Sequence, residues 1–200
     1  MSNTKITLAK AFKSISLAAL LFSATPALAF DDHRQGFIFG LGAGFHSINL
    51  DFLYNGFNYG SESESGIATS FKIGGGLTDQ LALYYVRNVS WYSAPYSDRF
   101  TTTDATYTVG LTGVGASYFL SPSAPSGYFM AAFGLGDIAV PSESVKPDTG
   151  SAFMFGAGYE FKNHLMAEAT WLVTNIESAD DSRFTLESSS LQFTLNYLFY

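Results

Sequence analysis

The segment 190–200 reads SLQFTLNYLFY, and apolar and polar residues alternate along it. Successive side chains of a β-strand point to opposite faces, so this alternation predicts a strand with one apolar and one polar face. The apolar face carries Leu191, Phe193, Leu195, Tyr197 and Phe199. Such a strand is typical of a transmembrane β-barrel, in which the apolar face contacts lipid and the polar face lines the interior.

The same alternation, interrupted by glycine, recurs along the chain and predicts eight strands. They fall at about 35–50, 67–77, 81–91, 104–120, 128–138, 151–161, 165–174 and 190–200. The connections alternate between long (51–66, 92–103, 139–150 and 175–188) and shorter (78–80, 121–127 and 162–164). We therefore expect an all-β fold, an eight-stranded antiparallel up-and-down transmembrane β-barrel with four loops outside and three periplasmic turns. A soluble β-sandwich or lipocalin-like barrel is the alternative, because alternation is a weak signal in each segment.

Aromatic residues gather beside the short turns, where a barrel carries its inner interfacial girdle. The residues expected there are Tyr118, Phe119, Tyr128, Phe129, Tyr159, Phe161, Phe199 and Tyr200.

The first 29 residues have the pattern of a cleaved signal peptide. Three lysines precede an apolar run at 15–22, and Ala27-Leu28-Ala29 forms a small-residue cleavage site before Phe30. A transmembrane anchor is less favoured, because the run is shorter than the roughly 18 residues that a spanning helix needs. We expect two parts, the signal peptide at 1–29 and a single barrel domain at 30–200.

Charge and composition exclude several classes of protein. The leader holds three lysines and no acid, so the remaining chain carries 7 basic and 17 acidic residues. This balance argues against nucleic acid as a partner, which favours basic stripes. The chain has no cysteine, so it contains neither a disulfide nor a thiolate metal site.

The chain resembles the small eight-stranded outer-membrane barrels of the OmpA/OmpX type, the outer membrane protein beta-barrel domain. The resemblance rests on Gly40-x-Gly42-x-Gly44, on Gly156-Ala157-Gly158-Tyr159-Glu160-Phe161 and on Leu165-Met166-Ala167-Glu168-Ala169. The last strand also resembles the C-terminal signature of these proteins, although Phe199 rather than the terminal Tyr200 is in phase with the apolar face. The resemblance implies the outer membrane of a Gram-negative bacterium and a filled barrel. The chain ends on the barrel strand, so we expect no appended peptidoglycan-binding domain.

Two strands do not keep one simple phase. In the third strand, the face with Leu83, Tyr85 and Val89 also carries Arg87, which would cost roughly 2–4 kcal/mol facing lipid at mid-membrane. Either the other face is outward there or a bulge shifts the phase. In the fourth strand, the apolar phase changes between Leu111 and Val114, which predicts a bulge near Gly113.

Charged residues on the inner face are the candidate site. Lys72, Glu160 and Glu168 are inward by phase, and Arg87 is assigned to the same lumenal polar cluster. An eight-stranded barrel is just wide enough for side chains to fill it, and charges inside it must be paired. The cluster therefore predicts a structural network that plugs the barrel; the alternative is a pore-lining set in a narrow channel for ions or small solutes.

We expect no catalytic residue, no metal site and no cofactor. His46 and Ser47 are similar to the His and Ser of outer-membrane lipid A deacylases, but adjacent strand residues point to opposite faces and cannot form a nucleophile–base pair. Gly40-Leu41-Gly42-Ala43-Gly44 lacks the spacing and the following helix of a nucleotide-binding loop. The protein is thus expected not to be an enzyme.

The four long connections are acidic, which gives the expected outer end its character. They carry twelve acids in or beside them and only Arg99, Lys146 and Arg183 as bases. A solvated rim is the simplest explanation; the alternatives are a docking surface for a surface ligand and divalent cations that bridge to lipopolysaccharide phosphates. The expected partners are outer-membrane lipid and lipopolysaccharide, with a possible loop ligand, and the protein is expected to be monomeric. The leading function is envelope integrity or surface interaction.

Overall fold

The computed structural model describes residues 33–98, 101–141, 147–179 and 181–200. The predicted signal peptide at 1–29 lies outside the described residues. Within this part of the chain, no helix is long and apolar enough to cross a membrane.

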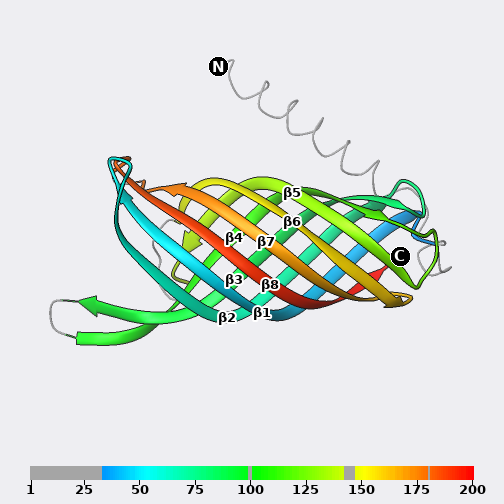
Figure 1. Ribbon diagram of the computed structural model, residues 1–200, viewed down its shortest axis with the longest axis horizontal. Helices are drawn as coiled ribbons and strands as arrows, with labels where there is room; N and C mark the ends of the chain where they lie inside the picture. Colours follow the sequence, from blue (N-terminus) through cyan, green and yellow to red (C-terminus); the bar gives the residue numbers. More distant parts are fainter. Residues whose placement is uncertain (1–32, 99–100, 142–146, 180) are drawn as a thin grey trace, which may run out of the picture.

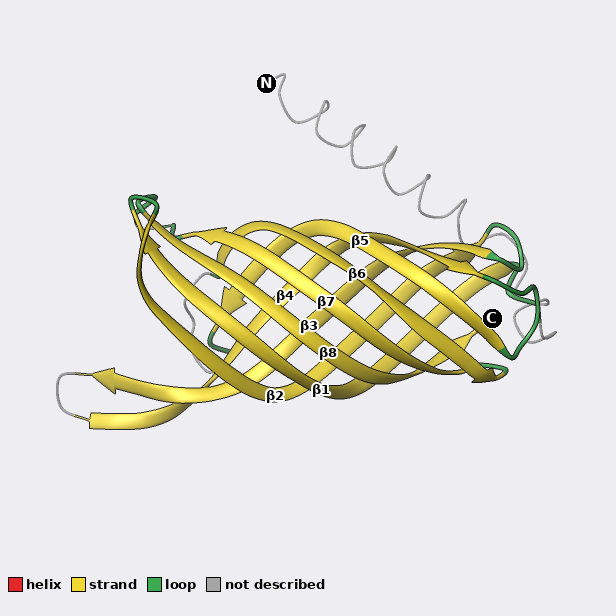
Figure 2. Ribbon diagram, in the orientation of Figure 1, coloured by secondary structure: helices red, strands yellow, loops and turns green. Residues whose placement is uncertain are grey.

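The described chain forms a closed barrel of eight strands, in which each strand pairs with its sequence neighbour and the first pairs with the last (Figures 1 and 2). All pairs are antiparallel. The strands are β1 (Gly36–Tyr54), β2 (Phe57–Gly76), β3 (Leu81–Asp98), β4 (Thr101–Phe119), β5 (Ser126–Ala139), β6 (Asp148–Lys162), β7 (Leu165–Glu177) and β8 (Phe184–Phe199). The predicted eight-stranded antiparallel barrel is confirmed.

The two faces of each strand differ as the alternation predicts. On β8, Leu191, Phe193 and Leu195 are exposed, whereas Gln192 and Thr194 are buried in the interior. The exposed large apolar side chains form a belt around the barrel, which includes Phe37, Leu41, Phe45, Ile67, Leu83, Tyr85, Val114, Tyr118, Phe129, Phe133, Leu135, Phe153, Phe155, Tyr159, Trp171, Val173 and Leu191. A belt of this size matches the lipid-facing band of a transmembrane barrel.

The predicted long loops 51–66 and 92–103 are largely strand, which corrects the expectation from the sequence. β1 and β2 pair as far as Tyr54↔Phe57, and only Asn55 and Gly56 connect them. Both turn residues have positive φ, at 51° and 79°, as the Asn-Gly pair of a two-residue hairpin requires. The sequence of Ser61–Ser65 was interpreted as a loop because both faces of this strand segment are polar. Above the belt, both faces of a strand contact water, so the alternation of apolar and polar residues is lost.

The fourth strand has no bulge near Gly113, because its pairing with β3 and β5 is continuous through that residue. Val109 and Leu111 are buried in the interior, whereas Val114 and Tyr118 point outward. The apolar phase changes because the upper interior is itself apolar, and the backbone stays regular.

The predicted inner girdle is correct for five of its eight residues, of which Phe199 is half-buried on the outer face in register with Phe39. Tyr118, Phe129, Tyr159 and Phe161 are exposed on the outer face. Phe119, Tyr128 and Tyr200 instead point inward and are buried. Adjacent strand residues face opposite ways, so one member of each aromatic pair had to enter the interior.

β2 and β3 separate above the belt. Their pairing ends at Ile67↔Trp91, although β1–β2 and β3–β4 continue as separate hairpins (Figure 1). A surface cleft of about 480 Å³ lies at the point of separation and is lined by Gly66, Ile67, Thr69, Trp91 and Tyr92 among others.

Candidate functional site

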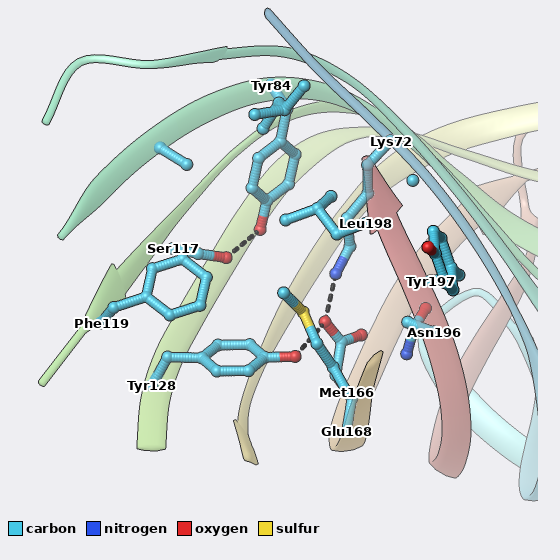
Figure 3. Close-up of a pocket in the computed structure, with 13 residues that line it drawn as sticks. Lys72, Tyr84, Ser117, Phe119, Tyr128, Met166, Glu168, Asn196, Tyr197 and Leu198 are labelled. Atoms are coloured by element: carbon cyan, nitrogen blue, oxygen red, sulfur yellow. Dashed lines mark hydrogen bonds and ion pairs between the residues drawn. The ribbon is translucent and has the colours of Figure 1, made fainter. Parts of the chain in front are cut away.

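Lys72 and Glu168 meet in the middle of the interior, as the phase of β2 and β7 predicts (Figure 3). Lys72 Nζ forms an ion pair with Glu168 Oε1, and Tyr128 from β5 donates its hydroxyl to the same oxygen at 2.7 Å. The ammonium also lies 5.5 Å from the ring centroid of Tyr84. All four side chains are buried. We call this set, with Ser117 hydrogen-bonded to Tyr84, the Lys72 network.

The Lys72 network fills its level of the barrel. The cavity beside it measures about 10 Å³, which is close to the least space that holds one water molecule. Gly158 makes room for the Tyr128 ring, since a Cβ at this position would lie 2.3 Å from Tyr128 Cζ. The small residue on β6 thus allows the large one on β5 to reach Glu168.

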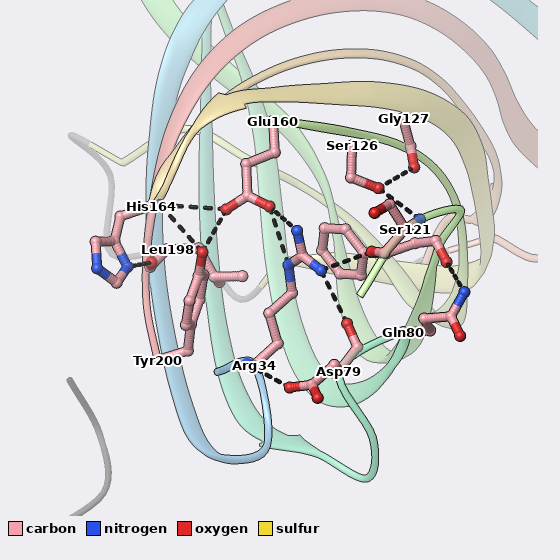
Figure 4. Close-up of polar contacts among 11 residues, drawn as sticks. Arg34, Asp79, Gln80, Ser121, Ser126, Gly127, Glu160, His164, Leu198 and Tyr200 are labelled. Atoms are coloured by element: carbon pink, nitrogen blue, oxygen red, sulfur yellow. Dashed lines mark hydrogen bonds and ion pairs between the residues drawn. The ribbon is translucent and has the colours of Figure 1, made fainter. Parts of the chain in front are cut away.

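Glu160 pairs with a residue that the sequence analysis did not single out, Arg34, just before β1 (Figure 4). Arg34 Nε donates to Glu160 Oε2 at 2.9 Å, and its Nη1 donates to the carbonyl oxygens of Asp79 and Ser121, each at 2.9 Å. The guanidinium carbon lies 4.0 Å from the ring centroid of Phe119. Arg34 therefore closes the mouth of the barrel beside the short turns.

The second oxygen of Glu160 explains the unusual C-terminus. Tyr200 donates its hydroxyl to Glu160 Oε1 at 2.7 Å, and the backbone N–H of His164 donates to the same oxygen at 3.1 Å (Figure 4). Tyr200 is out of phase with the lipid-facing residues because it points inward, where it is 1% exposed. We call Arg34, Glu160 and Tyr200 the Arg34 network.

The upper interior is closed by apolar side chains. Ile48, Leu50, Tyr92 and Val109 form a buried cluster, with Phe52, Ala94, Tyr107, Ile138 and Leu186 packed against it. Below it, Gln192 and Ser190 from β8 reach across to Ser90 on β3, at 3.0 and 3.1 Å. Among the described residues, the buried acids and the buried Lys and Arg are Arg34, Lys72, Glu160 and Glu168, two of each sign and all paired.

Arg87 does not belong to the lumenal cluster, which corrects that assignment. It lies in register with Phe71 and Thr112 on the outer face, and its side chain is 30% exposed. The guanidinium passes over Gly110 to form a two-point ion pair with Asp137 on β5, and its Nη1 donates to Thr112 Oγ1 at 2.8 Å. The phase of β3 places Arg87 outward with Leu83 and Tyr85, and the acid that offsets the cost of this placement lies two strands away.

His46 and Ser47 lie on opposite faces, as adjacent strand residues must. His46 is buried in the interior with Nε2 3.0 Å from the carbonyl oxygen of Trp91, and Ser47 is exposed on the outer face. No group of three His, Asp or Glu side chains in the described ranges is placed to hold a metal ion.

The outer end carries a pocket that the sequence analysis did not predict. Tyr54, Tyr59, Asp181, Arg183 and Phe184 line a surface hollow of about 350 Å³, which we call the tip pocket. It forms where the β1–β2 turn meets the β7–β8 loop (Figure 1), joined by a 2.9 Å hydrogen bond from the Asn55 N–H to the Arg183 carbonyl oxygen.

Within the tip pocket, an ion pair lies against an aromatic ring. Arg183 Nη2 donates to Asp181 Oδ2 at 2.7 Å, and the guanidinium carbon is 5.3 Å from the ring centroid of Tyr54. The Arg183 guanidinium holds the pKa of Asp181 below its usual range by hydrogen bonding to the carboxylate. Asp181 is therefore an anion at neutral pH.

Several comparisons bear on the family. Neisserial surface protein A matches with 14% identity, 80% of this chain, 96% of that one and a TM-score of 0.50. The attachment invasion locus protein Ail of Yersinia pestis matches with 10% identity over 82% of this chain and 99% of Ail, at a TM-score of 0.49. The outer membrane protease OmpT of Escherichia coli matches with 9% identity over 87% of this chain and 99% of OmpT, at a TM-score of 0.42. No curated protein matches the chain.

These identities are low, and the match to Neisserial surface protein A supports the fold alone. The sequence itself matches the family described as "Outer membrane protein beta-barrel domain" over residues 15–199, which is nearly its whole length. With the closed eight-stranded barrel and its apolar belt, this match places the protein in the outer membrane of a Gram-negative bacterium, and the chain belongs to the outer membrane protein beta-barrel domain family.

Proposed function

We propose that this protein is a non-enzymatic, sealed outer-membrane barrel that acts through its extracellular end, by surface interaction. The observation that carries the proposal is the filled interior. The described Asp, Glu, Lys and Arg side chains buried inside the barrel are paired, and apolar side chains close its upper part. A channel for ions needs a continuous hydrated path, and neither the paired charges nor the apolar cluster provides one.

The outer end, in contrast, presents side chains that the barrel does not need for its own packing. Phe57 and Tyr59 are 79% and 62% exposed. Tyr59 lies eight residues along β2 from Ile67, the last apolar residue on the lipid-facing side, so at a tilt of about 45° it stands roughly 19 Å higher. The polar headgroup layer of a leaflet is roughly 5–8 Å thick, so these aromatics lie beyond it. Exposed aromatic groups of this kind are typical of interaction sites.

The register of the β1–β2 hairpin allows a clean test. Deleting 51–54 and 57–61 removes the paired residues above Leu50↔Glu62, including Phe57 and Tyr59. It keeps Asn55-Gly56 as the turn and Leu50 in the apolar cluster. Bacterial cells that display the wild-type protein, the shortened hairpin, or the lumenal control Lys72→Met/Glu168→Met are compared for adhesion to host-cell monolayers and for resistance to detergent. Equal surface levels are verified by labelling.

Surface interaction predicts that the shortened hairpin loses adhesion and that the lumenal variant keeps it. Adhesion that survives the shortening would overturn the proposal. A loss of detergent resistance with unchanged adhesion would move the function to envelope integrity.

A further inference from the structure

The tip pocket has the composition of a receptor for a cation. Two tyrosine rings and a phenylalanine ring line the same hollow as the carboxylate of Asp181. The Tyr54 and Phe184 centroids lie 4.8 Å apart, and those of Tyr59 and Phe184 lie 6.3 Å apart. Aromatic faces attract Lys and Arg side chains, and aromatic groups that enclose a cation recur in ligand recognition. The carboxylate of Asp181 adds the anion that a guanidinium pairs with in two-point geometry.

The chain's own Arg183 shows which group fits. Its guanidinium makes two kinds of contact there, hydrogen bonds to both oxygens of Asp181 and a cation–π contact with Tyr54. Yet Arg183 remains open to solvent, with 58% of its side chain exposed. An exposed ion pair of this kind adds little stability, so another guanidinium can replace it at little cost.

The aromatic rings of the pocket do not serve the membrane belt. Tyr54 and Phe184 pair with each other in register and are in phase with Leu50 and Ser188, which are buried in the interior. They therefore continue the inner face of the barrel above its mouth. Lipid packs against the opposite face, so the membrane does not account for the exposed aromatic surface.

The charge of the outer end favours a basic partner. Above the apolar belt, Arg183 is the single Lys or Arg among the described residues, whereas Asp51, Glu62, Glu64, Asp104, Asp148, Glu177, Asp181 and Glu187 are acidic. Glu62 and Glu64 are in phase with the inner face, the face that bears the pocket. An excess of one sign attracts the opposite sign over roughly a Debye length, about 8 Å at physiological salt.

We propose that the tip pocket binds the guanidinium of an arginine side chain on a basic partner polypeptide, and that Arg183 occupies this place in the free protein. This rests on the proposed function and names the chemistry of the partner. Arg183 is then a competitor within the site. The hydrogen bond that joins the two loops uses its backbone carbonyl, so it survives substitution of the side chain.

Competition predicts opposite effects for the two members of the ion pair. Arg183→Gln vacates Asp181 and the Tyr54 ring and strengthens binding of an arginine peptide by about two- to fivefold, whereas Asp181→Asn and Tyr54→Leu weaken it by about two- to fivefold. If the ion pair served only to hold the loop in place, both Arg183→Gln and Asp181→Asn would weaken binding.

The assay measures fluorescence anisotropy of a labelled ten-residue Arg-Ser repeat peptide, titrated with the refolded protein in lipid nanodiscs. The same peptide with citrulline in place of arginine removes the charge at almost constant shape. Two variants control for net charge: Lys162→Gln, at a short turn on the opposite end, matches Arg183→Gln, and Asp104→Asn, exposed on β4, matches Asp181→Asn.

The proposal requires that the arginine peptide bind more tightly than the citrulline peptide and that each pocket variant change binding more than its charge-matched control. Equal binding of the two peptides, or an Arg183→Gln variant no tighter than Lys162→Gln, would overturn it. Free spermidine that competes as well as the peptide would assign the pocket to small cations instead. Should adhesion depend on the hairpin while these variants have no effect, the proposed function stands and this inference fails.

Discussion

Replacing Glu168 tests whether the interior is stabilised by its ion pair or only by the packing of its side chains. Its carboxylate is 5% exposed, holds Lys72 in an ion pair and accepts the Tyr128 hydroxyl at 2.7 Å. Glu168→Gln preserves the shape and leaves an acceptor for Tyr128, but it leaves the Lys72 ammonium buried without a counter-charge. Removing one partner of a buried pair costs about 3–5 kcal/mol.

The free energy of unfolding is measured by urea titration of the barrel refolded into lipid vesicles. Fluorescence of Trp91 and Trp171, the two tryptophans of the chain, reports unfolding. The matched control is Lys72→Met/Glu168→Gln, which removes both charges and keeps an acceptor for the Tyr128 hydroxyl. Replacing both members of a buried ion pair is often neutral or stabilising. We expect a loss of about 3–5 kcal/mol for the single variant and a change within about 1 kcal/mol for the double one. A single variant as stable as wild type, or a double variant as unstable as the single one, would refute the reasoning.

Three further substitutions test other parts of the account by the same titration. Arg34→Met leaves the fully buried Glu160 without the guanidinium of Arg34 and lowers the free energy of unfolding by about 3–5 kcal/mol. The double variant Arg34→Met/Glu160→Gln restores most of this loss. A double variant as unstable as the single one would argue against a paired network. Asp137→Asn removes the counter-charge of the outward Arg87 and lowers the free energy of unfolding by about 1–3 kcal/mol. An unchanged urea midpoint would mean that lipid and water alone accommodate the guanidinium. Gly158→Ala places a Cβ 2.3 Å from Tyr128 Cζ and destabilises the barrel by about 1–3 kcal/mol. The control Gly60→Ala, whose Cβ would have no heavy atom within 4 Å, leaves the free energy of unfolding unchanged. Equal effects of the two substitutions would contradict the packing of Tyr128 over Gly158.

The architecture was predictable because lipid enforces a strict alternation wherever a strand crosses the membrane. Leu191, Phe193 and Leu195 show this on β8, and Lys72, Glu160 and Glu168 were assigned inward by the same phase. Above the belt that constraint disappears, so Ser61–Ser65 looked like a loop. The Asn55-Gly56 pair was the available signal of a two-residue hairpin, and it indicates directly that the flanking residues pair.

The pairing of charges could not be predicted, because partners in a barrel are distant in sequence. Arg34 and Glu160 are 126 residues apart, and nothing local connects them. Arg87 was misassigned for a related reason: the cost of an outward arginine was considered alone, and Asp137 on another strand offsets that cost. The out-of-phase Tyr200 was noticed as a departure from the pattern, and only the structure shows its hydroxyl bound to Glu160.

Single-channel conductance of the refolded protein in a planar bilayer tests the sealed barrel most directly. A gel shift between boiled and unboiled samples verifies that the inserted protein is folded. The account predicts no conductance steps from the wild-type protein, because paired charges and the apolar cluster of Ile48, Leu50, Tyr92 and Val109 close the path. Discrete, reproducible steps from folded protein would contradict it, and would make Lys72, Glu160 and Glu168 pore-lining residues.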